Sequence, residues 1–514
     1  MLIAGFYGKV TLMSIRCASL LLIGSAFLVS PPLHACAERA VAGSVELTTA
    51  SLSDLRAALD ARKVTSVELV RGYLARIADC NPRLHAIIAT NARALSEAAT
   101  LDRERRAGKV RGPLHGIPVV LKDNIDLAGA VTTAGSLALT GNLRTHSAPL
   151  VDSLTAAGVI VIAKTNLSEW ANFRSRWSSS GWSAVGGLAV NPHNPQRSAC
   201  GSSSGSAAAV AAHLAPLAVG TETNGSIVCP ASVNGVVGLK PTVGLIPGAG
   251  IVPISHSQDT AGPMTARVSD AAMLLEAMAD PKRPGAANYS GALKADALKG
   301  VRLGVARFIQ GYSPPTEQTF NAALTVLKAH GAELVEIGKF DLTPIRELQL
   351  PILLTEFKAD LNAYLATAPA TVASRTLADL IAFNRAEIRE TPWFGQDLFE
   401  QAQATAGLDD PAYTQALQKA RALAGPEGID RLLKEHNVVA LLAPTSGPAW
   451  TIDLVNGDRS VGSASLLAAI SGYPHLTVPM GEAGGLPVGL SFIGPAWSEQ
   501  LLLSLGYAFE QARR

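Results

Sequence analysis

Apolar residues recur along this chain in two patterns, one with a helical period and one typical of short buried strands. Residues 44–110 follow the helical period, and capping-box spacings begin at Ser51 and Thr65, each just before an amphipathic run. We expect the second run, residues 67–78, to end before Pro82, because proline has no backbone N–H to continue a helix. This part of the chain predicts a layer of helices.

From residue 112 to 243 short apolar segments alternate with helical ones. Residues 117–121 and 159–163 are typical of buried strands, and residues 151–157 of a helix between them. Residues 207–217 form an apolar, alanine-rich run that favours a helix. Such alternation indicates an α/β fold with a layered sheet.

The second half of the chain repeats the strand signals on either side of a long helical stretch. Residues 280–300 are polar and contain Pro and Gly, which indicates a surface connection. A strand is expected at 300–305, mostly helix over 315–435, and strands followed by a final helix from 438 to 514. We therefore predict one domain over 44–514 with a helical insertion at about 315–435.

The N-terminal 37 residues differ from the rest. Lys9 and Arg16 precede an uncharged apolar run over 17–30, and Ala-Cys-Ala around Cys36 has the form of a cleavage site. The run is short for a membrane span. We expect a signal peptide at 1–37 and an exported protein, periplasmic or secreted, without a membrane span in its mature form. Alternatives are a lipid anchor at Cys36 and an N-terminal segment that is disordered or buried.

Composition excludes several classes of partner and cofactor. The 514 residues carry 43 basic and 41 acidic side chains without a basic block, so no nucleic acid partner is expected. Outside the signal segment only Cys80, Cys200 and Cys229 remain, too few for a disulfide framework. We expect Cys200 and Cys229 to be small buried residues, although they could also form a bridge. Metal-ligand motifs are missing from the sequence, so we expect no metal. We also expect no other cofactor and a monomeric protein.

Two turns rich in serine and glycine, and one lysine, carry the candidate chemistry. Ser202 lies in CGSSSG and Ser226 in TNGSI, 226 − 202 = 24 positions later. Ser226 is the expected nucleophile, because a glycine-containing turn lets successive backbone N–H groups point at one oxyanion. A serine needs a base, and no histidine has a recognisable triad context. Lys122 follows the apolar run 117–121 and would serve if burial keeps it neutral, with Ser202 passing the proton.

The same residues have plainer interpretations. GSSSGS alone is typical of a flexible linker, but here it leads into an apolar run. Residues 201–205 also match G-x-S-x-G, the nucleophile elbow of α/β-hydrolases, which needs a preceding strand where this chain has a loop sequence. A phosphate-binding loop would need GK[ST], which is missing. A lone lysine after a strand is usually a solvated strand end.

The chain resembles the amidase-signature family over roughly residues 45–510. The resemblance rests on five motifs that match the family in order and spacing: GxPxxxKD, GSSSGS, NGSI-x-x-PA, GVVGLKPT and SQDTAGPM. The resemblance implies a single α/β catalytic domain, with a mixed central sheet covered by helices on both faces and the insertion at about 315–435 lining the substrate cleft. It implies a Ser-Ser-Lys triad of Ser226, Ser202 and Lys122, with a cis peptide before Ser202. The implied oxyanion donors are the backbone N–H groups of Thr223, Asn224, Gly225 and Ser226, supported by hydrogen bonds of Ser203 and Asp259.

Two departures from the common family pattern indicate one branch of the family. Asn224 and Val228 stand where many members have Gly and Arg, as in the peptide amidase branch. That branch hydrolyses the C-terminal amide of peptides to the free acid and ammonia, so a short peptide amide or another small-molecule amide is the expected partner. Alternatives are a broader acyl or aryl amidase and a binding protein on an inactive hydrolase scaffold. A transamidation subunit for tRNA charging does not fit a signal peptide.

Overall fold

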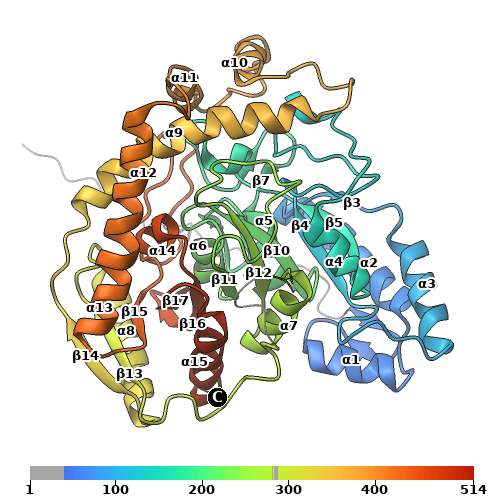
Figure 1. The fold of residues 1–514 in the computed structure, drawn as a ribbon. Helices are drawn as coiled ribbons and strands as arrows, with labels where there is room; N and C mark the ends of the chain where they lie inside the picture. Colours follow the sequence, from blue (N-terminus) through green and yellow to red (C-terminus); the bar gives the residue numbers. More distant parts are fainter. Residues whose placement is uncertain (1–39, 281, 283–287, 514) are drawn as a thin grey trace, which may run out of the picture. The chain divides into compact units, whose positions relative to one another are not determined.

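The computed structural model describes residues 40–280, 282 and 288–513, so the expected signal peptide and Cys36 lie outside the described residues. Its centre is an eleven-stranded mixed sheet (Figure 1). In spatial order the strands are β14 (Glu333–Ile337), β13 (Arg302–Ala306), β15 (Ala440–Pro444), β17 (Leu486–Ile493), β16 (His475–Ala483), β11 (Val237–Lys240), β12 (Thr260–Thr265), β10 (Leu217–Glu222), β4 (Pro118–Lys122), β5 (Ile160–Thr165) and β3 (Ile87–Thr90).

Parallel pairing in this sheet is confined to two regions. β4 lies between β10 and β5 and is parallel to both. β13 is parallel to β14 and β15. The other pairs are antiparallel, so the expected mixed sheet is confirmed. The strands are short and almost continuously apolar, as expected where helices cover a sheet.

Helices from both halves of the chain flank the sheet. α15 (Glu499–Ala512) packs on α7 (Val268–Met278) and on α8 (Pro314–Ala329). α7 also packs on β12, and α8 and α15 pack on β16. α5 (Ser204–Ala211) packs on β10 and β12, and α6 (Val228–Val233) on β11, β16 and β17. α4 (Pro149–Ala156) contacts α7. A large apolar core lies between the sheet and these helices.

The N-terminal helices are α1 (Leu52–Asp60), α2 (Ser66–Leu84) and α3 (Ala94–Arg106). Both expected capping boxes are present, at Ser51 and Thr65. The expected end of the second helix before Pro82 is wrong, because α2 continues through Pro82 to Leu84. A proline in the last turn removes a single backbone hydrogen bond, and the buried side chains of Cys80 and Leu84 keep that turn packed.

The expected helix over 207–217 is too long. α5 ends at Ala211, and the chain re-enters the sheet as β10 at Leu217. Pro216 disfavours helical geometry in the residue before it, which explains the break.

The stretch 315–435 is mostly helical and contains one edge strand, β14, which pairs with β13. Its helices are most of α8, then α9 (Thr343–Ala366), α10 (Leu377–Ala386), α11 (Asp397–Gln403), α12 (Pro411–Ala424) and α13 (Arg431–Glu435), and α14 (Leu466–Ser471) follows later in the chain. α9 packs on α10, α11 and α12 (Figure 1). An apolar cluster that includes Phe357 and Phe399 joins α9 to α10 and α11. None of the helices in the described ranges combines the length and the apolar character that a membrane crossing needs.

Smaller elements complete the described chain. They are three two-stranded sheets, β1 (Val41–Ala42) with β2 (Val45–Glu46), β6 (Trp182–Ser183) with β7 (Gly187–Leu188), and β8 (Val190–Asn191) with β9 (Asn194–Ser198). Short irregular helical turns occur at Leu137–Leu139, Glu169–Asn172 and Gly425–Asp430.

Candidate active site

Lys122 is the last residue of β4 and is completely buried. Its Nζ lies 2.7 Å from Ser202 Oγ, 2.9 Å from Thr221 Oγ1 and 3.2 Å from the Thr221 carbonyl oxygen. Burial lowers the pKa of Lys122 to about 7, although Asp259 and Glu222 act in the opposite direction. The apolar strand that the sequence predicts thus ends in a lysine that can lose its proton near neutral pH.

Ser202 lies two residues before α5, and the Gly201–Ser202 peptide bond is cis, as the family resemblance implies. Its carbonyl accepts a hydrogen bond from Ser168 N–H at 3.1 Å. Gly201 permits close packing, since a Cβ there would meet Ser168 Oγ at 2.1 Å and Ser180 Oγ at 3.0 Å. The backbone therefore fixes Ser202 against Lys122.

Ser226 lies in the turn between β10 and α6 and is almost buried. Its carbonyl accepts from Ser203 N–H at 3.1 Å, which joins this turn to that of Ser202. Gly225 has φ +84°, the left-handed region that glycine tolerates. Within the described residues, neither the Ser226 hydroxyl nor the N–H groups of Asn224, Gly225 and Ser226 are hydrogen-bonded to another group. These groups are free to meet a substrate.

Asp259 and Ser203 hold the backbone around this turn. Thr223 Oγ1 donates to Asp259 Oδ1 at 2.5 Å, and Asp259 Oδ2 accepts from the N–H groups of Ile254 and Ser255 at 2.7 and 2.9 Å. Burial raises the pKa of Asp259 to about 6. Ser203 Oγ donates to the Thr221 carbonyl at 3.0 Å. Hydrogen bonds therefore join Lys122 to the turn of Ser202, that turn to the turn of Ser226, and Asp259 to Thr223.

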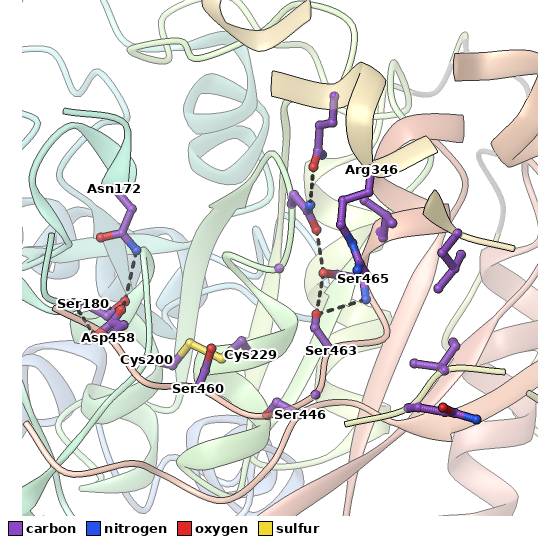
Figure 2. Close-up of a pocket in the computed structure, with 18 of the residues that line it drawn as sticks. Asn172, Ser180, Cys200, Cys229, Arg346, Ser446, Asp458, Ser460, Ser463 and Ser465 are labelled. Carbon is purple, nitrogen blue, oxygen red and sulfur yellow. Dashed lines mark hydrogen bonds between the residues drawn. A yellow bond between two sulfur atoms is a disulfide. The ribbon is translucent and has the colours of Figure 1, made fainter. Parts of the chain in front are cut away.

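Cys200 and Cys229 form a disulfide with a Cα–Cα distance of 6.1 Å (Figure 2). The expectation that these cysteines are two separate buried residues is wrong. The bridge forms because each cysteine lies beside one of the two Ser/Gly turns, which pack against each other. It joins the turn of Ser202 to the turn of Ser226.

Several contacts of this neighbourhood could not be predicted from the sequence. Glu222 Oε2 accepts from the N–H groups of Ile227 and Val228 at 2.7 and 3.0 Å, closing the turn of Ser226. Asn224 donates to Gln349 Oε1 at 3.0 Å and accepts from Ser465 Oγ at 2.5 Å. Because Gln349 and Ser465 lie far along the chain, no local pattern could place them here.

An open cavity of about 880 Å³ adjoins Asn224, Gly225 and the disulfide (Figure 2). One wall is apolar and comes from the second half of the chain, lined by Phe308, Ile309, Phe340, Leu342 and Leu466. The opposite end is polar and includes Asn172, Ser180, Trp450 and Asp458. Part of the 315–435 stretch lines this cavity, since α9 contributes Arg346 and Gln349.

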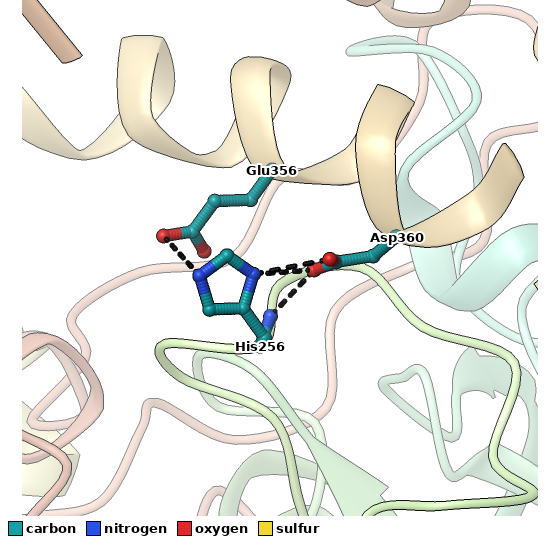
Figure 3. A group of neighbouring side chains, drawn as sticks. All are labelled: His256, Glu356 and Asp360. Carbon is teal, nitrogen blue, oxygen red and sulfur yellow. Dashed lines mark hydrogen bonds and ion pairs between the residues drawn. The ribbon is translucent and has the colours of Figure 1, made fainter. Parts of the chain in front are cut away.

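Among the described residues, His256, Glu356 and Asp360 form a group with the donor types and spacing of a metal site (Figure 3). His256 Nδ1 lies 2.9 Å from Asp360 Oδ2, its backbone N–H donates to the same oxygen at 2.8 Å, and Nε2 lies 3.6 Å from Glu356 Oε1. The Asp360 hydrogen bond raises the pKa of His256. An imidazolium between two carboxylates fits this geometry, and it ties the loop that carries Asp259 to α9.

Comparisons with known proteins show the family of the chain. The chain matches the model of the amidase family over residues 68–503. It is 38% identical to a probable amidase of Arabidopsis thaliana, over 96% of this chain and 95% of that protein. It is 35% identical to one subunit of the glutamyl-tRNA(Gln) amidotransferase of Thermosynechococcus vestitus, over 90% of this chain and 97% of that protein.

Among solved structures, the native peptide amidase of Stenotrophomonas maltophilia is 50% identical, with a TM-score of 0.85 over 90% of this chain and 96% of that chain. A structure of peptide amidase with the competitive inhibitor chymostatin is also 50% identical, with a TM-score of 0.86 over 90% of this chain and 97% of that chain. Motifs, fold and comparisons agree, and the chain belongs to the amidase-signature family, is an amidase, and resembles the peptide amidase branch in particular.

Proposed function

We propose that this amidase hydrolyses the C-terminal amide of peptides to the free acid and ammonia, with Ser226 as nucleophile and Lys122 as base through Ser202. The observation that carries the proposal is the contact between a buried lysine with a pKa of about 7 and a serine hydroxyl 2.7 Å away. A lysine that is neutral at working pH is a competent general base.

The surroundings of Lys122 suit a neutral amine. A neutral amine has two N–H donors and one lone pair, whereas the ammonium ion has three donors. The Thr221 carbonyl and hydroxyl can accept both N–H groups, at 3.2 and 2.9 Å. The Ser202 hydroxyl is then free to donate to the lone pair. Both N–H groups and the lone pair of the neutral amine then have a hydrogen-bonding partner.

In the proposed reaction the Ser226 oxygen attacks the amide carbon while its proton passes through Ser202 to Lys122. The oxyanion accepts hydrogen bonds from backbone N–H groups among Thr223 to Ser226, each typically worth about 100- to 1,000-fold in rate. The proton returns to the leaving nitrogen, which departs as ammonia and leaves a Ser226 ester. Water then attacks that ester by the same proton route and releases the acid.

The cavity and the similarity to peptide amidases support the proposed substrate class. Because the leaving group of a primary amide is only ammonia, a large cavity beside Ser226 has to be filled by the acyl part of the substrate. A volume of about 880 Å³ with one apolar and one polar end suits a short peptide. The 50% identity to peptide amidase structures over 90% of this chain supports the same substrate.

We also propose that the protein is exported. Its N-terminal 37 residues have the sequence of a signal peptide. The Cys200–Cys229 disulfide supports this proposal, because such bonds persist in oxidising compartments. N-terminal sequencing of protein recovered from the periplasm or medium tests it, and a mature chain that keeps residues 1–30 would contradict export by cleavage.

Ammonia release by the protein without its signal segment tests the proposed substrate. The substrates are a C-terminally amidated dipeptide, the same dipeptide as free acid, and a simple fatty or aryl amide. We expect release from the amidated dipeptide, none from Ser226→Ala, and wild-type release from Ser96→Ala, a control on the exposed face of α3. Preference for the simple amide would favour a broader acyl or aryl amidase. No ammonia release from any of the amides would favour a binding protein on an inactive hydrolase scaffold.

A further inference from the structure

Three ionisable side chains line the active-site cavity: Asp341, Asp458 and Arg346. Since the proposed substrate lies in this cavity, a charged group that the protein leaves without a hydrogen bond or an ion pair is the one most available to the substrate. The three side chains differ in how many hydrogen bonds they form with other groups of the protein.

Both acids are engaged. Asp458 accepts from Ser180 N–H and Oγ at 3.1 and 2.5 Å and from Trp450 Nε1 at 3.0 Å, and burial raises its pKa. Asp341 accepts from the Thr343 N–H at 2.9 Å at the start of α9, and this bond lowers its pKa. Each carboxylate therefore has a structural hydrogen-bonding role.

Arg346 has no such role. Within the described part of the chain its guanidinium forms no ion pair and no hydrogen bond. In Figure 2 its side chain extends from α9 toward the part of the cavity where Ser465 lies, while Asn172, Ser180 and Asp458 lie at the other end. The described lining of the cavity thus has one unpaired cation, on its apolar side.

The backbone fixes Arg346 close to the reacting centre. Gln349 lies three residues after Arg346 on the same helix, and therefore on the same face and about 4.5 Å further along the axis. Gln349 contacts Asn224, two residues before the proposed nucleophile. An extended peptide advances about 3.3 to 3.6 Å per residue. Arg346 is therefore within reach of the side chain of the last residue of a bound peptide amide, or of the residue before it.

We propose that Arg346 is a specificity-determining residue that selects peptide amides with an acidic side chain at the last or second-to-last position. This inference rests on the proposed function and narrows its substrate class. The carboxylate of Asp or Glu meets the guanidinium, and the stem of the side chain packs on the apolar wall beside it. A basic side chain at the same position is repelled.

The expected preference is moderate, because Arg346 is exposed to solvent. Exposed ion pairs contribute little and charge-assisted hydrogen bonds more, so we expect kcat/KM for the acidic substrate to be roughly threefold to tenfold higher than for its neutral isostere. The preference should shrink with added salt, since the screening length falls to about 10 Å at 0.1 M.

N-acetylated dipeptide amides test this inference without a charge at the peptide N-terminus. The series is Ac-Xaa-Ala-NH₂ and Ac-Ala-Xaa-NH₂ with Glu, Gln or Lys at Xaa, assayed by ammonia release at low and high salt. The variants are Arg346→Gln and Arg346→Glu. The matched control is Arg71→Gln, which removes the same charge from an exposed position on α2.

We expect the wild type and Arg71→Gln to prefer Glu over Gln, and Gln over Lys, in at least one of the two series. Arg346→Gln should bring the Glu-to-Gln ratio close to one, and Arg346→Glu should reverse the order. Equal rates for all neutral and charged peptides in the wild type, or an unchanged ratio in Arg346→Gln, would overturn the role of Arg346 while leaving the peptide amidase proposal intact. Hydrolysis of none of the peptides would overturn both.

Discussion

Cys200 and Cys229 are bonded to each other, and each lies within three residues of a serine of the proposed triad. Cys200 precedes Ser202 by two positions, and Cys229 follows Ser226 by three. The disulfide encloses the whole of α5 and β10 between the two turns. The distance between the two serines thus depends on a covalent bond as well as on backbone hydrogen bonds.

Removing this disulfide should lower both stability and activity. A bridge with a sequence separation of 29 stabilises by about 3 to 4 kcal/mol in the chain-entropy view. We expect the urea midpoint of Cys200→Ala/Cys229→Ala to fall and its kcat to drop more than its KM changes, because the turns are no longer tied together. Urea denaturation and steady-state assays check this, and a double variant with unchanged midpoint and kcat would contradict it.

Lys122 should destabilise the fold in a pH-dependent way. Its folded pKa of about 7 lies below the unfolded value, so the unfolded chain binds the extra proton between these values and stability rises with pH. The loss of folding stability caused by burying Lys122 is fully present below about pH 7, where it amounts to about 4 to 5 kcal/mol. It disappears above about pH 10.4, where Lys122 is neutral in the folded and the unfolded chain. We expect Lys122→Met to be more stable than the wild type, with a gain that shrinks from pH 7 to pH 10.

Urea midpoints of wild type and Lys122→Met across that range measure the difference. The lost contacts to Ser202 and Thr221 reduce the absolute gain but not its pH dependence. A gain that stays constant from pH 6 to pH 10 would mean that Lys122 keeps its proton in the folded protein and cannot be the base.

His256 should stabilise the loop of Asp259 only at lower pH. Asp360 and Glu356 on α9 face its ring, as do Tyr413 and Arg421 on α12, and the net effect raises the pKa of His256. A raised pKa adds stability that is present below the unfolded value of about 6.5 and is lost as pH rises through the folded value. We expect His256→Gln to lower the urea midpoint at pH 5.5 more than at pH 8.5.

Asp360→Asn offers a reciprocal check, since it removes the charge that the imidazolium faces (Figure 3). It should abolish most of the same pH-dependent difference. Equal losses at both pH values in either variant would show that the histidine acts by packing alone.

The sequence was most informative where local chemistry decides the structure. Lys122 could be placed at a strand end because the five residues before it are apolar, and Ser202 and Ser226 in turns because of the glycines around them. The capping boxes of α1 and α2 follow from side chains three residues apart, which is a local contact.

Long-range packing explains what the sequence did not reveal. The disulfide and the contacts of Asn224 with Gln349 and Ser465 join segments that meet only after the sheet has formed. The end of α2 was misplaced because packing of its last turn outweighs the preference of Pro82. The edge strand β14 lies inside a largely helical stretch, because β13 offers it a parallel partner.

Labelling with a serine-directed fluorophosphonate, read by intact-mass and peptide mass spectrometry, tests the central claim most directly. The account predicts a single adduct on Ser226 of the wild type and of Ser96→Ala, none on Ser226→Ala, and much slower labelling of Lys122→Ala and Ser202→Ala. Equal labelling of Ser226→Ala, or wild-type rates in Lys122→Ala, would contradict a Ser-Ser-Lys mechanism in this protein.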